Sequence, residues 1–267
     1  MKSFAFHQPN EIPAAVRLLA EQPESRPLAG GMTLIPTLKQ RLAAPAALVD
    51  LAGLPGIKGF SNGNAQVTIG AMTIHAEVAS SPLVKGQIPA LAALAAAIGD
   101  PAVRNRGTIG GSVANNDPAA DYPAGVLGLG ATIVTSEREI AADDFFRGLF
   151  ETALKPNEII TAIRFPVPLS SGYAKFKAPA SRYALVGVFV AKVPTGVRVA
   201  VTGAGPGVFR VPQMERALGE SFDPTAIAAI RIDAEGLTSD IHADAGYRAH
   251  LVTVMAKRAV AAAISAA

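Results

Sequence analysis

Hydrophobic and polar residues follow two periods along this chain, and each period indicates a different kind of element. Short alternating runs such as 197–202 are typical of strands with one buried face. Longer stretches whose apolar residues return every three or four positions, such as 244–264, are typical of amphipathic helices. In the first two thirds of the chain the pattern predicts strands at 3–6, 26–29, 48–51, 57–61, 66–70, 131–136 and 158–165, and helices at 13–21, 34–42, 74–79, 89–98 and 124–129.

Turn and capping residues mark the ends of several of these segments. Asn10 is placed to cap the helix near Pro13, because its side chain can accept a hydrogen bond from an N–H of the first turn. Asn62-Gly63-Asn64 lies between two strands and favours a tight hairpin. Residues 100–123 show no clear period, so we expect a long loop there.

A proline pair, Pro166 and Pro168, is followed by Ser170-Ser171-Gly172 and marks the best internal boundary. Beyond it the pattern predicts strands at 173–177, 185–193 and 197–202, and helices at 212–218, 224–230 and 244–264. We therefore expect a mixed α and β region up to residue 168. The remainder has an α+β pattern, in which helices follow a small sheet.

Composition narrows the class of protein. Half of the 267 residues are hydrophobic and 17% are charged, which favours a folded protein with a sizeable core. The 24 basic and 21 acidic residues give a net charge of +3, and the scattered basic residues speak against a nucleic-acid partner. The longest apolar stretch, 88–98, is too short to span a bilayer. The absence of cysteine excludes disulfides and iron–sulfur clusters held by this chain alone, and it fits a cytoplasmic location.

The first segment that could carry chemistry is Leu28-Ala29-Gly30-Gly31-Met32-Thr33, between a predicted strand and a predicted helix. Two glycines permit a positive φ and a close approach of the backbone to a ligand. Successive N–H groups before a helix form a concavity that binds anions, and Thr33 could add a hydroxyl donor. An ordinary strand-to-helix turn is the alternative interpretation.

The second segment lies within the expected loop at 100–123. Gly107, Gly110 and Gly111 can bring backbone donors against a ligand, while Thr108, Ser112 and Asn115 can add side-chain hydrogen bonds. Asp121 is a candidate acceptor for a ribose hydroxyl or a flavin ring N–H. The alternative is a capped surface loop with Asp-Pro turns.

Three other patterns give weaker evidence for a functional site. Gly203-Ala204-Gly205-Pro206-Gly207 suggests a nucleotide fingerprint, but Val208 stands where the next glycine would be needed, which favours a structural turn. The four histidines share no metal-ligand spacing, and we expect each to be exposed or hydrogen-bonded. Asp143-Asp144 is typical of a solvated turn or a helix cap. The chain offers no evident acid–base pair, nucleophile or metal site.

In order and spacing, these segments resemble the FAD-binding medium subunits of molybdenum hydroxylases, which include the carbon monoxide dehydrogenases and xanthine-dehydrogenase-like enzymes. The resemblance covers nearly the whole chain. Its motifs are Ala29-Gly30-Gly31-Met32-Thr33, Ile69-Gly70-Ala71-Met72-Thr73, Arg104-Asn105 leading into Gly107-Thr108-Ile109-Gly110-Gly111, Asp117-Pro118-Ala119-Ala120-Asp121, Lys155-Pro156-Asn157-Glu158-Ile159-Ile160 and Tyr247-Arg248-Ala249-His250-Leu251.

The resemblance implies an α+β fold. It consists of a two-lobed FAD-binding domain of the vanillyl-alcohol-oxidase (PCMH) type at residues 1–168, with lobes at about 1–54 and 55–168. A small C-terminal domain with an antiparallel sheet and helices follows at 169–267. The implied cofactor-binding residues are Leu28, Ala29, Gly30, Gly31, Met32, Thr33, Thr108, Gly110, Gly111, Ser112, Asn115, Asp121, Ile160, Lys177 and Tyr183. The chain departs from the family pattern at Met32, Ser112 and Arg182.

The resemblance also implies a function. In this family electrons leave a molybdenum centre, bound to a molybdopterin-type cofactor on a large subunit, and pass through two [2Fe–2S] clusters on a small subunit. They then reach FAD on the medium subunit and go to an external acceptor. We expect such an electron-transfer role here, in a dimer of heterotrimers. The alternatives are a self-sufficient FAD-dependent oxidase or dehydrogenase and a flavin-free scaffold or assembly protein. The sequence names neither the substrate nor the acceptor.

Overall fold

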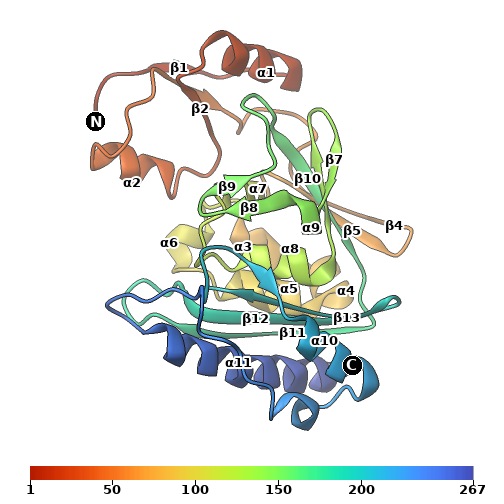
Figure 1. Cartoon of the computed structure of the whole chain (residues 1–267). Helices are drawn as coiled ribbons and strands as arrows, with labels where there is room; N and C mark the ends of the chain where they lie inside the picture. The colour runs from red at the N-terminus through yellow and green to blue at the C-terminus, as the bar shows by residue number, and fades with distance from the viewer. Residues whose placement is uncertain (267) are drawn as a thin grey trace.

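A computed structural model describes residues 1–266 and begins with a small parallel sheet (Figure 1). Its strands lie in the order β1-β3-β2, and helices α1 and α2 form its connections. Ala15 and Leu19 of α1 pack with Val49 and Leu51, because the helix turns its apolar stripe toward the sheet. The elements of this lobe are β1 (Ala5–His7), α1 (Ile12–Glu21), β2 (Ser25–Leu28), α2 (Leu34–Lys39) and β3 (Ala47–Asp50).

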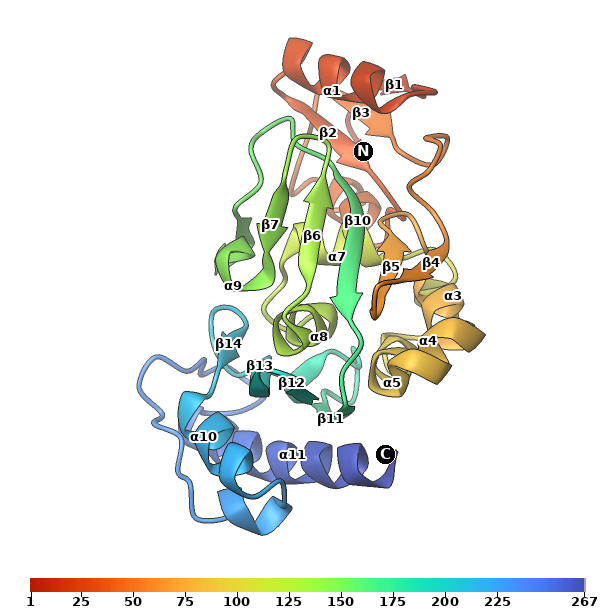
Figure 2. The same cartoon turned by 90° about the vertical axis from the view of Figure 1, so that its right-hand side faces the viewer.

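A five-stranded antiparallel sheet follows, with the strand order β4-β5-β10-β6-β7 (Figure 2). Its strands are β4 (Phe60–Gly63), β5 (Gln66–Gly70), β6 (Thr132–Thr135), β7 (Glu139–Ala141) and β10 (Ile160–Pro166). Six helices lie between β5 and β6 in the chain: α3 (His75–Ser80), α4 (Pro82–Gln87), α5 (Pro89–Ala96), α6 (Pro101–Arg104), α7 (Ile109–Asn115) and α8 (Tyr122–Leu129). Helices α7 and α8 pack on β10 and share its hydrophobic core.

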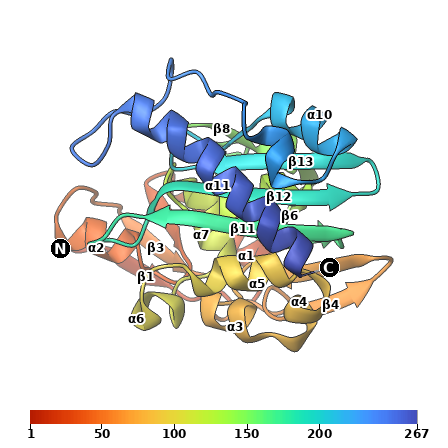
Figure 3. The same ribbon diagram turned by 90° about the horizontal axis from the view of Figure 1, so that it is seen from below.

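The C-terminal part forms an antiparallel sheet in the order β11-β12-β13-β14, with α11 crossing one face (Figure 3). Helices α5 and α8 pack on the other face, which explains why β12 is buried almost throughout. Gly125 and Gly128 let α8 approach the ring of Phe189. The elements are β11 (Ser170–Lys177), β12 (Ala184–Val193), β13 (Gly196–Thr202), β14 (Phe209–Arg210), α10 (Pro212–Glu220), the 3₁₀ helix η1 (Pro224–Ile227) and α11 (Ala245–Ser265).

The long loop expected at 100–123 was wrong in detail, because the segment contains α6 and α7 and the start of α8. Three other expectations need correction. The first N-terminal helix is capped at Glu11 without a side-chain hydrogen bond, so Asn10 is not its cap. The hairpin turns at Asn64 and Ala65, which both have positive φ, rather than at the Asn-Gly step. The helix expected at 224–230 is a single 3₁₀ turn.

The expected boundary segment Ser170-Ser171-Gly172 already belongs to β11. Gly172 is required there because a Cβ would lie 2.0 Å from the carbonyl oxygen of Ala259 on α11. The sequence pattern also missed α9 (Ala142–Phe145), β8 (Phe146–Gly148), β9 (Glu151–Thr152), β7 and β14, which are two to four residues long. Such short elements carry no measurable period. In residues 1–266, no helix is both long enough and apolar enough to cross a membrane.

Candidate functional site

A cleft of about 530 Å³ lies between the N-terminal lobe and the α7 and α8 region. Its walls include the turn after β2, the first turn of α7, the segment before β10 and the turn between β11 and β12. Of the predicted site residues, the lining contains Ala29, Gly30, Gly31, Met32, Thr33, Thr108, Gly110, Gly111, Ser112, Asn115, Asp121, Ile160 and Tyr183. The structure therefore brings together segments that are distant in the sequence.

The two glycine turns touch each other directly. A Cβ on Gly30 would lie 2.0 Å from the carbonyl oxygen of Arg106, and a Cβ on Gly111 would lie 3.3 Å from the Cβ of Ala29. Gly31 has a φ of +74°, a conformation that side chains disfavour. Glycine is thus needed at 30 for the contact between the turns, and at 31 for the backbone conformation.

The first turn, residues 30–33, presents a row of backbone donors. Within the described chain, the N–H groups of Gly30, Gly31, Met32 and Thr33 donate to no protein acceptor. Helix α2 begins directly afterwards, and its N-terminus adds a positive dipole end. Such a row of donors beside a helix start suits an anionic ligand.

The second turn uses most of its donors internally. The N–H of Ile109 donates to Thr73, that of Gly110 to Ala71 at 2.8 Å, and that of Gly111 to the Thr108 hydroxyl at 3.1 Å. Thr108 is therefore the N-cap of α7. The cap and the two backbone bonds fix this turn against the segment that follows β5, so its main contribution is the shape of the cleft wall.

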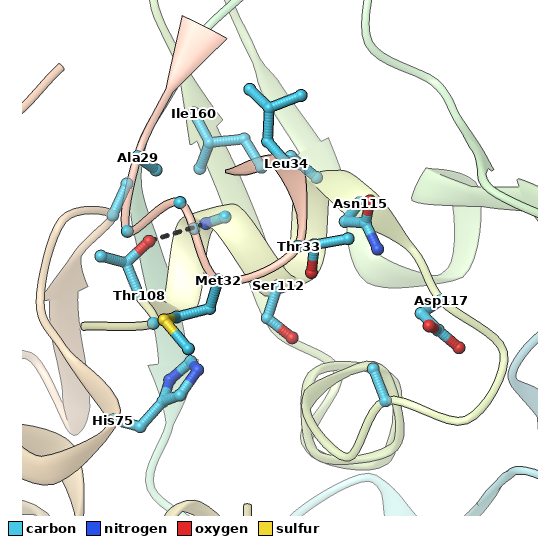
Figure 4. Close-up of a pocket in the computed structure, with 18 of the residues that line it drawn as sticks. Ala29, Met32, Thr33, Leu34, His75, Thr108, Ser112, Asn115, Asp117 and Ile160 are labelled. Atoms are coloured by element: carbon cyan, nitrogen blue, oxygen red, sulfur yellow. Dashed lines mark hydrogen bonds between the residues drawn. The ribbon is translucent and has the colours of Figure 1, made fainter. Parts of the chain in front are cut away.

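Three polar side chains gather in the space between the turns (Figure 4). Thr33 comes from the first turn, while Ser112 and Asn115 come from successive turns of α7. In the described chain their side-chain hydroxyl and amide groups carry no hydrogen bond, and all three residues line the cleft. They can therefore bind the polar groups of a ligand.

Asp121 lies on the wall of the cleft, but its carboxylate is held by the protein. Tyr173 donates a hydrogen bond to Oδ1 at 2.5 Å, and the Lys175 ammonium lies 2.8 Å from Oδ1 and 3.0 Å from Oδ2. Burial raises the pKa of Asp121, while the charge and the hydrogen bonds of Lys175 and the hydrogen bond from Tyr173 oppose that rise.

His75 is a buried histidine in the floor of the cleft, 4% exposed. Its Nδ1 is buried and has no hydrogen-bond partner in the described chain, and its ring lies 5.3 Å from that of Tyr122. Burial and the Arg104 charge lower its pKa to about 4, so the ring is neutral at physiological pH. The sequence-based expectation of an exposed or hydrogen-bonded histidine was wrong at this position.

Glu158 organises the segment that carries Ile159 and Ile160 to the cleft. Its buried carboxylate accepts hydrogen bonds from the Arg138 side chain, the Thr135 hydroxyl and the N–H of Lys155. Burial raises the pKa of Glu158, but the hydrogen bonds from these groups outweigh burial and lower that pKa to about 2. The resulting network fixes the segment that brings Ile159 and Ile160 into the cleft lining.

Comparison with known proteins decides the family. Residues 2–168 match the family described as the FAD binding domain in molybdopterin dehydrogenase. The chain belongs to this family of FAD-binding medium subunits of molybdenum hydroxylases.

Several curated relatives and solved structures match over nearly the whole chain. The carbon monoxide dehydrogenase medium chain of Afipia carboxidovorans is 37% identical, covering 97% of this chain and 96% of that protein. The nicotine 6-hydroxylase medium subunit of Paenarthrobacter nicotinovorans is 35% identical, with 97% of each covered. Reconstituted CO dehydrogenase from Oligotropha carboxidovorans superimposes with a TM-score of 0.91 at 33% identity, covering 100% of this chain and 99% of that one. Quinoline 2-oxidoreductase from Pseudomonas putida 86 superimposes with a TM-score of 0.90 at 29% identity, covering 100% of this chain and 99% of that one.

Two of the residues that the sequence predicted for the site of this medium subunit lie outside the cleft lining. Leu28 packs behind the turn, where its Cδ1 would lie 3.4 Å from a Cβ on Gly31. Lys177 is exposed at the end of β11, whereas Lys175, two residues earlier, reaches the wall. The sequence reasoning missed further lining residues, among them Arg26, Leu34, Met72, His75, Ile98, Asp117, Glu158, Ile159 and Arg182.

The glycine-rich segment after β13 serves the fold of the medium subunit. The N–H of Gly203 donates to the carbonyl of Pro118, and its own carbonyl accepts a hydrogen bond from Arg248 at 2.8 Å. Asp143, expected in a solvated turn or a cap, lies in the first turn of α9 and pairs with Arg198 and Arg210. Neither segment lines the cleft between the glycine turns.

Proposed function

We propose that this chain carries FAD in the cleft between the two glycine turns and transfers electrons within a heteromeric molybdenum hydroxylase. The observation that carries the proposal is the row of unpaired N–H donors at residues 30–33, which faces a wall whose close contacts tolerate only glycine. Membership in the family supports FAD as the ligand.

The residues present fit this cofactor. The N–H groups of Gly30 to Thr33 are placed to bind the diphosphate, and the first turn of α2 adds a favourable dipole. Thr33, Ser112 and Asn115 supply hydrogen bonds for phosphate or ribose oxygens. Ile160, Tyr183 and the neutral His75 present apolar or uncharged surface to a flavin ring. We propose Thr108, Gly110 and Gly111 as wall residues that shape the cleft.

Bound FAD supplies the redox chemistry, and the protein supplies binding, orientation and electrostatics. The walls of the cleft are held by the Thr108 cap and the Glu158 network, so the cofactor is placed against rigid backbone. We assign no substrate acid, base or nucleophile to this chain. The donor is then an iron–sulfur cluster of a partner subunit, and the final acceptor is external.

The proposed partners are a large subunit with a molybdopterin-type cofactor and a small subunit with two [2Fe–2S] clusters, assembled as a dimer of heterotrimers in the cytoplasm. The names of the relatives support a multisubunit assembly, since they are described as medium chains or subunits. Within this chain we propose an FAD-binding domain at 1–168 and a C-terminal domain at 169–267. The family match, which ends at residue 168, supports that division.

Purification of the native assembly, followed by its visible spectrum, metal content and subunit composition, tests this function. We expect one FAD for each copy of this chain, together with molybdenum, iron and two further subunits. A colourless monomer would contradict the proposal. A yellow monomer that oxidises a substrate without partners would instead support a self-sufficient FAD oxidase or dehydrogenase.

A further inference from the structure

Lys175 is a buried lysine that the function so far leaves unused. Its side chain is 5% exposed and reaches from β11 to two acceptors, the Asp121 carboxylate on the cleft wall and the carbonyl oxygen of Ala97 at 3.0 Å. A buried ammonium is costly unless it is paired and hydrogen-bonded. Its position therefore indicates a defined role for the ion pair.

Tyr173 approaches the same carboxylate from the same face of β11, two residues earlier. Its hydroxyl is 2.5 Å from Oδ1 of Asp121, and Gly187 on β12 leaves room for it, because a Cβ there would lie 2.6 Å from that hydroxyl. The C-terminal sheet thus delivers a donor and a cation to one carboxylate on the cleft wall.

An ionised carboxylate offers about four acceptor positions. Tyr173 uses one on Oδ1, and Lys175 binds Oδ2 while lying close to Oδ1. The backbone N–H of Asp121 also donates to this carboxylate. With one position taken by each of these three donors, one acceptor position remains for a ligand in the cleft that Asp121 lines.

We propose that Lys175 and Tyr173 are positioning residues of the cofactor site, which hold the Asp121 carboxylate ionised and oriented so that it accepts a hydrogen bond from the bound flavin dinucleotide. This inference rests on the proposed function. The family resemblance implied Lys177 as a cofactor-binding residue, but Lys177 lies exposed and outside the cleft lining, whereas Lys175 pairs with a residue of that lining.

Other ionisable groups surround Asp121, and each affects how its carboxyl titrates. Tyr122 follows it on α8, Asp117 lies on the preceding turn, and Tyr183 lines the cleft after the β11–β12 turn. Burial raises the pKa of Tyr122 and Tyr183, and the charge of Asp121 raises both further. Burial raises the pKa of Asp121, and the positive charge of Lys175 limits that rise. Removing Lys175 therefore raises the pKa further and favours the protonated carboxyl, which loses its acceptor role.

The test is equilibrium titration of flavin-free full-length chain with FAD, for wild type and Lys175→Met, between about pH 5 and pH 8. We expect Lys175→Met to bind FAD about tenfold or more weakly, with affinity falling further as the pH falls. Lys257→Met, at an exposed position on α11, is the matched control for losing one lysine charge and should bind as wild type does. Tyr173→Phe should weaken binding less, because Lys175 still holds the carboxylate.

A double-mutant cycle separates positioning from folding. If Lys175 acts through Asp121, then Lys175→Met should change FAD affinity little in an Asp121→Asn background, where no carboxylate remains. Equal effects of Lys175→Met in both backgrounds would overturn the inference, as would wild-type affinity and pH dependence in the single variant. Failure of the wild-type chain to bind FAD would instead contradict the proposed function.

Discussion

Alanine at position 30 would force the two glycine turns apart. Its Cβ would lie 2.0 Å from the carbonyl oxygen of Arg106 and 2.8 Å from the Cα of Gly107, and these backbone atoms cannot rotate away as a side chain could. Ordinary contacts begin at 3.4 Å, so the separation must grow from 2.0 Å to at least 3.4 Å. Overpacking of this kind costs about 1–3 kcal/mol.

Part of that cost falls on the cleft, because the displaced turn carries the N–H donors at 30–33. We therefore expect Gly30→Ala to weaken FAD binding by about tenfold to a hundredfold, at 1.4 kcal/mol for each factor of ten. Fluorescence titration with FAD measures the affinity, and circular dichroism verifies that the chain is folded. Gly63→Ala is the control, since a Cβ at Gly63 meets no atom within 4 Å. A folded Gly30→Ala variant with wild-type affinity would refute the contact between the turns as a determinant of binding.

Substitutions at the glycine turns, at His75 and at Glu158 should change FAD retention or stability in measurable ways. The variants Gly31→Val and Gly111→Val should both lose FAD during gel filtration. Valine at position 31 is strained by about 2 kcal/mol at a φ of +74°, and valine at position 111 places its Cβ 2.9 Å from the Thr108 hydroxyl. Full retention of FAD by both variants would contradict the assignment of the cofactor site to the glycine turns. His75 has a folded pKa of about 4 against an ordinary 6.5, so the unfolded chain binds more protons between these values. The free energy of unfolding, measured by urea titration, should therefore fall by about 3 kcal/mol from pH 6.5 to pH 4. The His75→Gln variant should show a smaller fall over the same pH range. An equal fall in both proteins would exclude His75 as the cause of the pH dependence. Glu158→Gln should lower the free energy of unfolding by about 2 kcal/mol, since it loses charged hydrogen bonds with Arg138, and an unchanged urea midpoint would contradict this.

Long helices and strands were predictable because the pattern of buried and exposed positions is visible within the segment itself. Strand β12 is a continuous apolar run between two helical layers, and α11 repeats its apolar positions over 21 residues. Helices α6 and α7 were missed because they have four and seven residues and contain proline or glycine. Local pattern gives little signal in such short segments.

The candidate site was predictable where glycine itself carries the signal. Gly30 is required by a close backbone contact and Gly31 by a positive φ, and each requirement is visible in the sequence as a glycine. The pairing of Asp121 with Lys175 joins residues 54 positions apart, and it depends on which side chains of β11 point toward the residue that precedes α8. The burial of His75 likewise depends on Gly107, where a Cβ would lie 2.5 Å from the imidazole Nε2. Tertiary packing alone reveals such contacts.

A comparison of FAD with riboflavin tests the central claim most directly, because riboflavin has the flavin ring but lacks the diphosphate. Titrating the flavin-free chain with each ligand measures how much of the affinity depends on the ADP part that riboflavin lacks, whose diphosphate we place at the donors of residues 30–33. We expect one equivalent of FAD, bound at least about a hundredfold more tightly than riboflavin, since charged hydrogen bonds contribute about 1.5–3 kcal/mol each. Equal affinities for the two ligands, or no binding of FAD, would contradict a diphosphate site between the glycine turns.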